Sequence, residues 1–246
     1  LSSSSAASDV YKRQGYTSVG LAQSDEEMKE WLTSNKPNWG SKWQAGDVKY
    51  KDLTGEGEVT PGASTLENHG DLKRIGNNSP RYRVGLNLDA AWKGIDFSIF
   101  FQGVLKRDWM FDAGDPYFWG AGSGMWQAAC FEEHMDYWTP ENTDAYYPKP
   151  YFNETKNQQA QDAYMQKASY LRCKNIQLGY TLPTHITEKA GISNCRIYLS
   201  CDNLFTITGL SSVYDPEVFG SYDGYGTSGK TYPLQRTISV GVNLNF

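Results

Sequence analysis

The sequence predicts an all-β fold made of long antiparallel strands, and three observations predict it. The last ten residues, Thr237–Phe246, alternate without exception between apolar side chains and small polar ones. Connections between the predicted strands alternate between short and long. The 246 residues include 17 Tyr, 8 Trp and 10 Phe, yet no run of about 18 apolar residues that a transmembrane helix needs. These features are typical of an outer-membrane β-barrel, whose strands each cross with about ten alternating residues.

Composition excludes some other classes of protein. The 23 basic and 28 acidic residues argue against nucleic acid as a partner, because phosphate binding needs a basic face. The four cysteines lack CxxC spacing and the three histidines are scattered, which argues against a zinc site or a disulfide framework.

The first 14 residues, Leu1–Gln14, are set apart from the rest of the chain. They are rich in Ser and Ala and lack the apolar segment of a signal peptide. The residues that follow them show no periodic pattern of apolar side chains. This stretch resembles a translated sequencing adapter, and we exclude it from the predicted fold. On that interpretation the natural chain begins earlier, and residues 15–246 are the C-terminal segment of a longer protein.

The first two predicted strands form a hairpin. Residues 81–92 place apolar side chains at every second position from Tyr82 to Trp92, and Lys93-Gly94 makes a two-residue turn. Residues 95–101 continue the alternation, which Phe100 interrupts.

Three more strands follow at residues 169–182, 195–207 and 237–246. In the first of them Leu171 and Cys173 are out of phase with Ile176 and Leu178, so we expect a bulge near Lys174-Asn175. The Cys173 thiol should not lie opposite Cys201, and both are interpreted as small apolar residues.

The loop lengths set the orientation of the sheet. The turns at Lys93-Gly94 and Thr184–Asn194 are short and lie on one side, whereas the loops 102–168 and 208–234 are long and lie on the other. Short periplasmic turns and long extracellular loops are usual in bacterial barrels. The final residue then falls on the periplasmic side.

Aromatic residues in the long loops are the candidate ligand-binding surface. Flat rings edged by carboxylates can stack on sugar faces, although rings in a long loop also pack on one another. The candidate substrate-binding residues are Trp109, Tyr117, Trp119, Trp126 and Trp138.

A second candidate is a calcium loop at Asp52–Val59 (DLTGEGEV), for which Asp52, Glu56 and Asp71 are the candidate Ca²⁺ ligands. Calcium needs six or more oxygen ligands, and the twelfth position, where a bidentate carboxylate belongs, is Ala63. These losses favour a polar turn without metal.

No catalytic residue is predicted. The chain has no GxSxG, HExxH or P-loop motif, and none of its loop carboxylates is singled out as a glycosidase pair.

Several segments together resemble SusC/RagA-type TonB-linked outer-membrane transporters. They cover residues 15–246 in the expected order. The Asp52 segment departs from the Asn-Gly-Asp-Gly core that is usual in such proteins. The segments are GDVKYKDLTGEGEV (46–59), RIGNNSPRYRVGLNLDAAWKGIDFSIFFQGV (74–104), YWTPENTDAYYPKP (137–150), ASYLRCKNIQLGYTLP (168–183), RIYLSCDNLFTIT (196–208), YDPEV (214–218) and YPLQRTISVGVNLNF (232–246).

This resemblance implies the C-terminal part, about five antiparallel strands with long extracellular loops, of a 22-stranded transmembrane β-barrel in the cell outer membrane. The implied function is import of oligosaccharides or peptides. The implied partners are a SusD-like surface lipoprotein, the TonB complex acting through an N-terminal part absent from this chain, membrane lipid, and the barrel-assembly machinery reading Phe246. The alternative is a soluble carbohydrate-binding β-sandwich domain, in which the apolar strand faces would be buried in protein.

Overall fold

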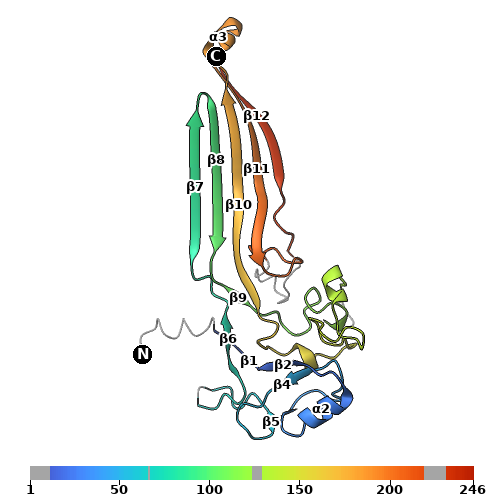
Figure 1. Cartoon of the computed structure of the whole chain (residues 1–246). Coiled ribbons are helices and arrows are strands. Elements are labelled where there is room, and N and C mark those ends of the chain that lie inside the picture. The colour runs from blue at the N-terminus through green and yellow to red at the C-terminus, as the bar shows by residue number, and fades with distance from the viewer. Residues whose placement is uncertain (1–11, 66, 124–128, 219–230) are drawn as a thin grey trace. The chain divides into compact units, whose positions relative to one another are not determined.

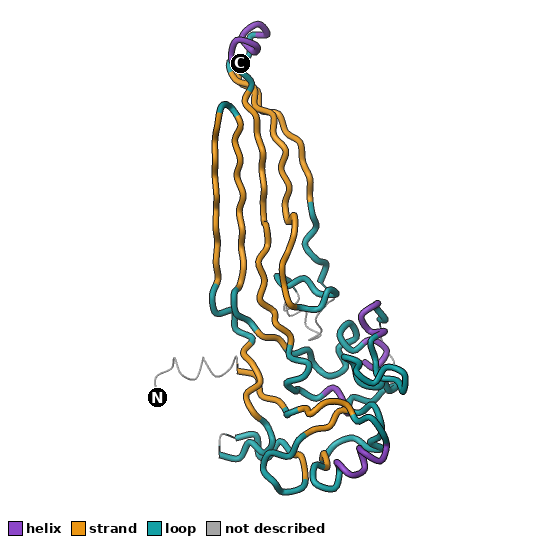
Figure 2. The backbone as a smooth tube through the Cα atoms, viewed as in Figure 1, coloured by secondary structure: helices purple, strands orange, loops and turns teal. Residues whose placement is uncertain are grey.

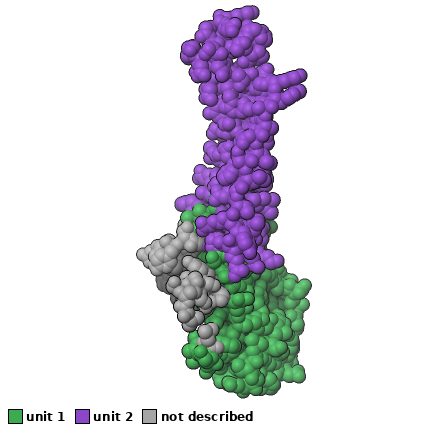
Figure 3. Space-filling model, turned by 90° about the vertical axis from the view of Figure 1, so that its left-hand side faces the viewer, with its two compact units in different colours: residues 1–79, 108–166, 211–231 green, residues 80–107, 167–210, 232–246 purple. Residues whose placement is uncertain are grey.

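A computed structural model gives the fold and describes residues 12–65, 67–123, 129–218 and 231–246. The chain divides into two compact units (Figure 3). Unit 1 comprises residues 1–79, 108–166 and 211–231, and unit 2 comprises residues 80–107, 167–210 and 232–246. The candidate ligand surface belongs to unit 1 and the predicted barrel strands belong to unit 2.

Unit 2 is a single antiparallel sheet of long strands that run side by side (Figures 1 and 2). The order across the sheet is β12-β11-β10-β8-β7, so each long strand lies beside the next long strand along the chain, and the short strand β9 (Asp108–Trp109) also pairs with β10. All-β architecture is thereby confirmed. The strands are β7 (Arg83–Trp92), β8 (Ile95–Val104), β10 (Gln166–Thr181), β11 (Asn194–Gly209) and β12 (Thr237–Asn245).

Each of these strands overlaps one of the predicted ranges, and they differ at the ends. The second predicted strand stops at Phe101, whereas β8 continues to Val104 because Gly103 and Val104 still pair with β7 and β10. In the same way β10 begins at Gln166 and β11 reaches Gly209. In these three strands the apolar periodicity stopped short of one end, where backbone pairing continues.

The expected bulge in β10 is present. Against β8, Cys173 and Asn175 pair with the consecutive residues Phe101 and Phe100, which leaves Lys174 as the extra residue. Against β11 they pair with Phe205 and Asp202, so there the extra residue lies on β11, where Asn203 has a φ of +52°. The shift returns Leu171 and Cys173 to the face that carries Ile176, because residues directly paired across a sheet share a face.

One end of the sheet carries the short turns. Lys93 and Gly94 both have positive φ, +48° and +87°, as the tight I′ hairpin requires. Two short helices, α3 (Thr184–Thr187) and η4 (Glu188–Ala190), join β10 to β11, and Gly191 closes them with φ +69°. The C-terminus lies at this same end of the sheet (Figure 1).

In its described residues, unit 1 is built from short strands, one helix and three 3₁₀ turns around a core. Its strand pairs are β1 with β6, β2 with β4, and β3 with β5. Helix α2 starts after Ser24, whose side chain accepts from the Glu27 N–H, and has three acidic residues in its first turn. The elements are β1 (Lys12–Gly15), β2 (Ser18–Leu21), α2 (Asp25–Trp31), β3 (Lys36–Pro37), β4 (Val48–Tyr50), β5 (Glu58–Val59), β6 (Lys73–Asn77), β9 (Asp108–Trp109), η1 (Gly120–Ser123), η2 (Glu132–Met135) and η3 (Lys156–Gln158).

Two features of unit 1 correct the sequence-based expectations. Lys12–Gln14 were assigned to a leader outside the fold, but they lie in β1 and pair with β6; residues 1–11 fall outside the described part. The segment 102–168 was expected as one long loop. Most of it instead contributes to a compact core together with residues 15–79, held by contacts between positions about a hundred residues apart.

A hydrogen-bonded network of buried polar side chains stabilises the core of unit 1. Lys156 Nζ lies 2.9 Å from Asp47 Oδ2, and both side chains are at most 1% exposed. Asn157 donates to Asp47 Oδ1 (2.8 Å) and accepts from the Val48 N–H (3.0 Å). Gln158 accepts from the Gly114 N–H (2.7 Å) and donates to the Gly122 carbonyl (2.5 Å). Turn η3 therefore joins the β4 region to the segment around η1.

None of the helices in the described residues is both long and apolar enough to cross a membrane.

Candidate functional site

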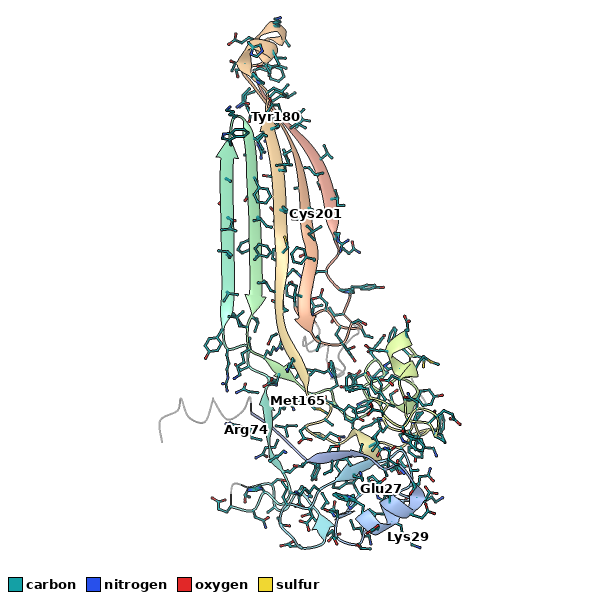
Figure 4. The ribbon with its side chains drawn as sticks, viewed as in Figure 1. Glu27, Lys29, Arg74, Met165, Tyr180 and Cys201 are labelled. Carbon is teal, nitrogen blue, oxygen red and sulfur yellow. The ribbon has the colours of Figure 1, made fainter. Side chains whose placement is uncertain are left out.

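The first functional surface is the apolar face of the unit 2 sheet. Pairing places apolar side chains of all five strands in rows, and most of the aliphatic ones among them are exposed. Cys201, near the middle of the sheet in Figure 4, belongs to the central row. From the turn end the rows are Trp92, Ile95, Tyr180, Ile197, Val242; Ala90, Phe97, Leu178, Leu199, Val240; Leu88, Ile99, Ile176, Cys201, Ile238; Leu86, Phe101, Cys173, Phe205; and Val84, Gly103, Leu171, Ile207.

The length of this face fits a membrane. Five rows two residues apart extend about 27 Å along a strand at about 3.4 Å per residue. The apolar band of outer-membrane barrels is about 25 Å tall, and its strands are tilted. A continuous apolar surface of this size is far larger than the scattered apolar residues of an ordinary protein surface.

The opposite face of the same sheet is polar. The Arg196 guanidinium forms an ion pair with Asp96, donating from Nε to Oδ2 (2.9 Å), and donates to Gln177 Oε1 (3.1 Å). It also lies 5.0 Å from the centre of the Tyr198 ring. The Tyr198 ring in turn lies across Gly241, where any Cβ would overlap it. Strand glycines thus give large polar side chains room to lie flat on this face.

Aromatic residues mark the turn end of the apolar face. Trp92 is 68% exposed with Lys93 Nζ 4.9 Å from its ring centre, and Tyr180 lies near the same end (Figure 4). Phe246 is 88% exposed. Tryptophan, tyrosine and lysine in such a band are typical of a membrane–water interface.

The second candidate site is a cavity of about 300 Å³ in unit 1. Its walls come from η1, η2, η3 and the segment 147–154, and rings and prolines dominate them. Two charged side chains, Lys149 and Glu154, also line it. Ring residues of the lining are Trp119, His134, Tyr137, Tyr147, Pro148, Pro150 and Tyr151.

The rings around this cavity are fixed by one another. Tyr147 meets His134 edge-on at 5.3 Å and Phe118 at 5.8 Å between ring centres. Burial raises the pKa of Tyr147 and of Tyr164 well above the ordinary tyrosine value, and burial together with the Asp115 carboxylate does the same for Tyr214. These phenols are therefore neutral at any physiological pH.

The predicted substrate-binding residues are distributed unevenly. Trp119 lines the cavity while its Nε1 donates to the Asp112 carbonyl (3.1 Å), and its ring is only 6% exposed. Trp138 is buried against Gly46 and lies outside the cavity lining. Tyr117 stacks on Phe131 with ring centres 5.9 Å apart. Trp109 is half-buried at β9, and Trp126 lies outside the described residues. Their role as ligand contacts stays a prediction.

The candidate calcium ligands are engaged by the main chain. Asp52 accepts from the Gly55 N–H (2.7 Å) and Gly57 N–H (2.6 Å), and Asp71 accepts from the Leu53 N–H (2.6 Å) and Thr60 N–H (2.7 Å). Desolvation opposes ionisation of Asp52, but these donors and the Thr54 hydroxyl outweigh it and hold its pKa below the usual range.

Geometry therefore gives Asp52 and Asp71 a structural role in closing the 52–71 loop. Glu56 is exposed, and no cluster of three or more His, Cys, Asp or Glu side chains suited to a metal occurs among the residues that the structure describes. Calcium binding stays a prediction.

Sequence reasoning missed the residues that shape the cavity. His134, Lys149 and Gln158 carry no motif, and they come together only through the packing of η2 and η3. The many aromatic residues between positions 109 and 152 indicated the segment that forms the cavity, but they did not indicate which residues line it.

Comparisons with known proteins agree with this architecture. A TonB-dependent receptor of Formosa agariphila, P3, is 29% identical over 208 residues, which are 82% of this chain and 19% of the relative. Receptor P26 of the same organism is 26% identical over 209 residues. No family model matches the chain. The chain spans about a fifth of the length of the relatives it matches.

Solved structures show the same fold. The RagAB peptide transporter superposes with a TM-score of 0.62 at 23% identity, covering 96% of this chain and 22% of that one. The closed-closed state of the RagAB peptide importer gives a TM-score of 0.62 at 20% identity.

The class that the fold defines is an all-β, antiparallel section of a membrane barrel. The resemblance to SusC/RagA-type TonB-linked outer-membrane transporters is confirmed by these relatives and neighbours.

Proposed function

We propose that residues 15–246 form part of the barrel and extracellular loops of a TonB-dependent active transporter in the outer membrane. The transporter imports peptides or oligosaccharides. The TonB complex energises it through a part of the protein outside this chain. The relatives carry the names of receptors, and no catalytic role is part of the proposal.

The observation that carries the proposal is the pairing of apolar with apolar residues across all five strands, with polar side chains on the other face. Lipid accepts one continuous apolar surface, and a water-filled interior accepts the Asp96–Arg196–Gln177 network. The edges β7 and β12 would pair with further strands in a closed barrel, because open sheet edges do not occur in hydrocarbon.

A SusD-like surface lipoprotein is the partner we propose at the extracellular side. Support comes from the fold shared with RagAB, whose description as a peptide transporter also makes peptides a candidate cargo. Unit 1 is a compact unit that could form the contact with the lipoprotein.

Uptake tests the proposal. The complete reading frame that contains this chain would be expressed in an outer membrane with its lipoprotein gene, and entry of labelled peptides and oligosaccharides measured with and without a functional TonB complex. We expect saturable uptake of one of the two cargoes that disappears without TonB. Equal uptake in both backgrounds would overturn the proposal.

The soluble β-sandwich was the alternative, and the geometry of unit 2 disfavours it. A sandwich buries the apolar face of each sheet against a second sheet about 10 Å away. In the described part of unit 2 the five strands form one layer, and Ile238, Val240 and Leu199 remain exposed. A domain with this face in water would aggregate.

A further inference from the structure

The apolar face of unit 2 runs obliquely across its strands. Along β7 and the residue before it, the apolar positions span Tyr82–Trp92, and along β12 and the residue after it they span Ile238–Phe246. The midpoint on β12, Val242, lies in the row that contains Trp92. The midpoint on β7 is Asn87, five residues from that row.

This offset gives the inclination of the strands in a membrane. Five residues are about 17 Å along a strand, and the four strand spacings from β7 to β12 are about 19 Å across the sheet. The apolar band is therefore inclined by about 40° to the perpendicular of the strands, which agrees with the tilt of about 35–45° in membrane barrels. The line along which the band ends is thus the expected edge of the hydrocarbon.

Cations mark the end of this band that lies away from the short turns (Figure 1). On four of the five long strands the first charged residue beyond the apolar positions is a lysine or an arginine. All four are exposed, and none forms an ion pair with a residue that the structure describes. We call these four residues the basic girdle: Arg81, Lys106, Lys167 and Arg236.

The charge at this end of the band is not balanced by acids. The nearest carboxylate in sequence, Asp108, accepts from the Asn77 N–H (3.0 Å). At the turn end, by contrast, acids and bases are mixed, and Glu188 lies beside Lys189 in η4. The whole chain has a net charge of −5, yet the segments that form the girdle end of unit 2 contain no Asp or Glu: 80–88, 100–107, 167–174, 203–210 and 232–238.

The place and charge of the girdle identify the chemistry of its ligand. Lysine and arginine side chains just outside the hydrocarbon reach the lipid headgroups, where both bind phosphate. A zwitterionic headgroup carries its own cation, which would need a carboxylate beside the girdle. A lipid whose phosphate groups have no compensating cation fits the charge of these segments.

The spread of the girdle also favours a lipid surface over a single soluble anion. The Arg81 N–H donates to the Lys106 carbonyl (3.0 Å), so these two residues lie on adjacent strands. Lys167 and Arg236 belong to β10 and to the residue before β12. The set therefore extends over about 19 Å of sheet, whereas a site for one small anion needs cations that converge on a point.

We propose that the basic girdle binds phosphate groups on lipids of the extracellular leaflet and so fixes the height of the barrel in the membrane. The girdle takes its extracellular position from the proposed function, on which this assignment rests, and it is independent of the cargo.

Native mass spectrometry of the full-length receptor in detergent tests the girdle with three lipid probes. They are lipid A, which is a phosphorylated glycolipid, the same lipid A treated with a phosphatase, and phosphatidylethanolamine. We expect lipid A to bind at least about tenfold more tightly than the other two, because only its phosphates lack a compensating cation. Inorganic phosphate at the same concentration should not displace it.

Matched double variants locate the binding. Arg81→Gln with Lys106→Gln removes two adjacent girdle charges. It should weaken lipid A binding about 30-fold, since each cation near an anionic lipid surface contributes about fivefold. Lys93→Gln with Lys189→Gln removes two exposed charges at the turn end and should leave the affinity within about twofold. Heat-modifiable migration in gels measures the folded fraction of each variant.

A second girdle pair, Lys167→Gln with Arg236→Gln, should weaken lipid A binding by a similar factor, so that the test does not depend on the folding of one variant. Four results would overturn the inference: equal binding of lipid A and its dephosphorylated form, displacement by inorganic phosphate, equal weakening by the girdle and turn-end variants, or loss of the lipoprotein partner from the girdle variants while lipid A binding is retained. The last result would assign the girdle to a protein contact.

The uptake assay separates this failure from failure of the proposed function. TonB-dependent uptake by a receptor that does not prefer lipid A contradicts the girdle alone, whereas a preference for lipid A without TonB-dependent uptake contradicts the transporter alone.

Discussion

Substitution of Ile99 by arginine tests the assignment of the two sheet faces. Ile99 lies in the central row of the apolar face, between Leu88 on β7 and Ile176 on β10. Its neighbour Ser98 lies on the opposite face, between Asp89 and Gln177. Ile99 and Ser98 therefore lie on opposite faces of the sheet, but they share the same strand, the same neighbouring strands and nearly the same depth in the membrane.

The expected magnitudes follow from the surroundings. Arginine at the lipid face of a barrel costs about 2 to 4 kcal/mol at the bilayer midplane. The central row is flanked by two rows on each side, so Ile99→Arg should lower the free energy of unfolding by about that amount. Ser98→Arg should change it by less than about 1 kcal/mol, because its new charge faces water and the Asp89 carboxylate.

Equilibrium unfolding by guanidinium measures both variants in the full-length receptor reconstituted into lipid vesicles, with tryptophan fluorescence as the signal. A difference of about 2 kcal/mol between the variants supports the assigned faces. Equal costs, or a larger cost at Ser98, would refute the reasoning that places Ile99 in lipid.

Three further predictions concern single groups. Phe246→Ala should lower the amount of receptor in the outer membrane, as measured by membrane fractionation, because we propose that barrel assembly recognises this aromatic residue and its alternating strand; unchanged abundance would reject this role. Lys156→Met should cost about 3 to 5 kcal/mol in urea unfolding by leaving the buried Asp47 carboxylate without its cationic partner, and a cost below about 1 kcal/mol would contradict the ion pair. Burial, reinforced by the Asp71 carboxylate, raises the pKa of Tyr16 to about 12. Because the pKa of tyrosine in the unfolded chain is about 10, neutral Tyr16 contributes its full stability below pH 10, and this contribution falls as the pH rises towards 12. Urea titrations at pH 9 and 11.5 measure this loss of stability, which Tyr16→Phe should reduce.

The barrel strands were predictable because their signal is local. In β12 every second residue is apolar, and that periodicity alone assigns Ile238 and Val240 to one face. The bulge could be placed near Lys174-Asn175 for the same reason: an extra residue between Cys173 and Ile176 brings the two halves of β10 into phase.

Unit 1 was not predictable in this way because its order is non-local. Asp47 and Lys156 are 109 positions apart, and neither lies in a periodic segment. The β1–β6 and β3–β5 pairs are too short for alternation to show. The rings of the 102–168 segment were recognised, but whether a ring such as Trp138 packs or contacts ligand depends on neighbours that sequence does not reveal.

His134 illustrates the same limit at the site. A lone histidine in EEHMD has no motif, and its buried position in the cavity lining emerges only from the packing of η2. Conversely, the DLTGEGEV loop had a recognisable outline, but the carboxylates of the candidate ligands Asp52 and Asp71 accept from main-chain donors.

The central claim is that the five-strand sheet faces lipid on one side and water on the other. Spin labels at each position from Ile238 to Asn243 of β12, in the full-length receptor in vesicles with its native cysteines replaced, would measure collision with oxygen and with a water-soluble nickel chelate. The account predicts an alternation with a period of two, in which oxygen contact is greatest at Ile238, Val240 and Val242 and nickel contact at the positions between them. Uniform access of the nickel chelate along the strand would contradict it.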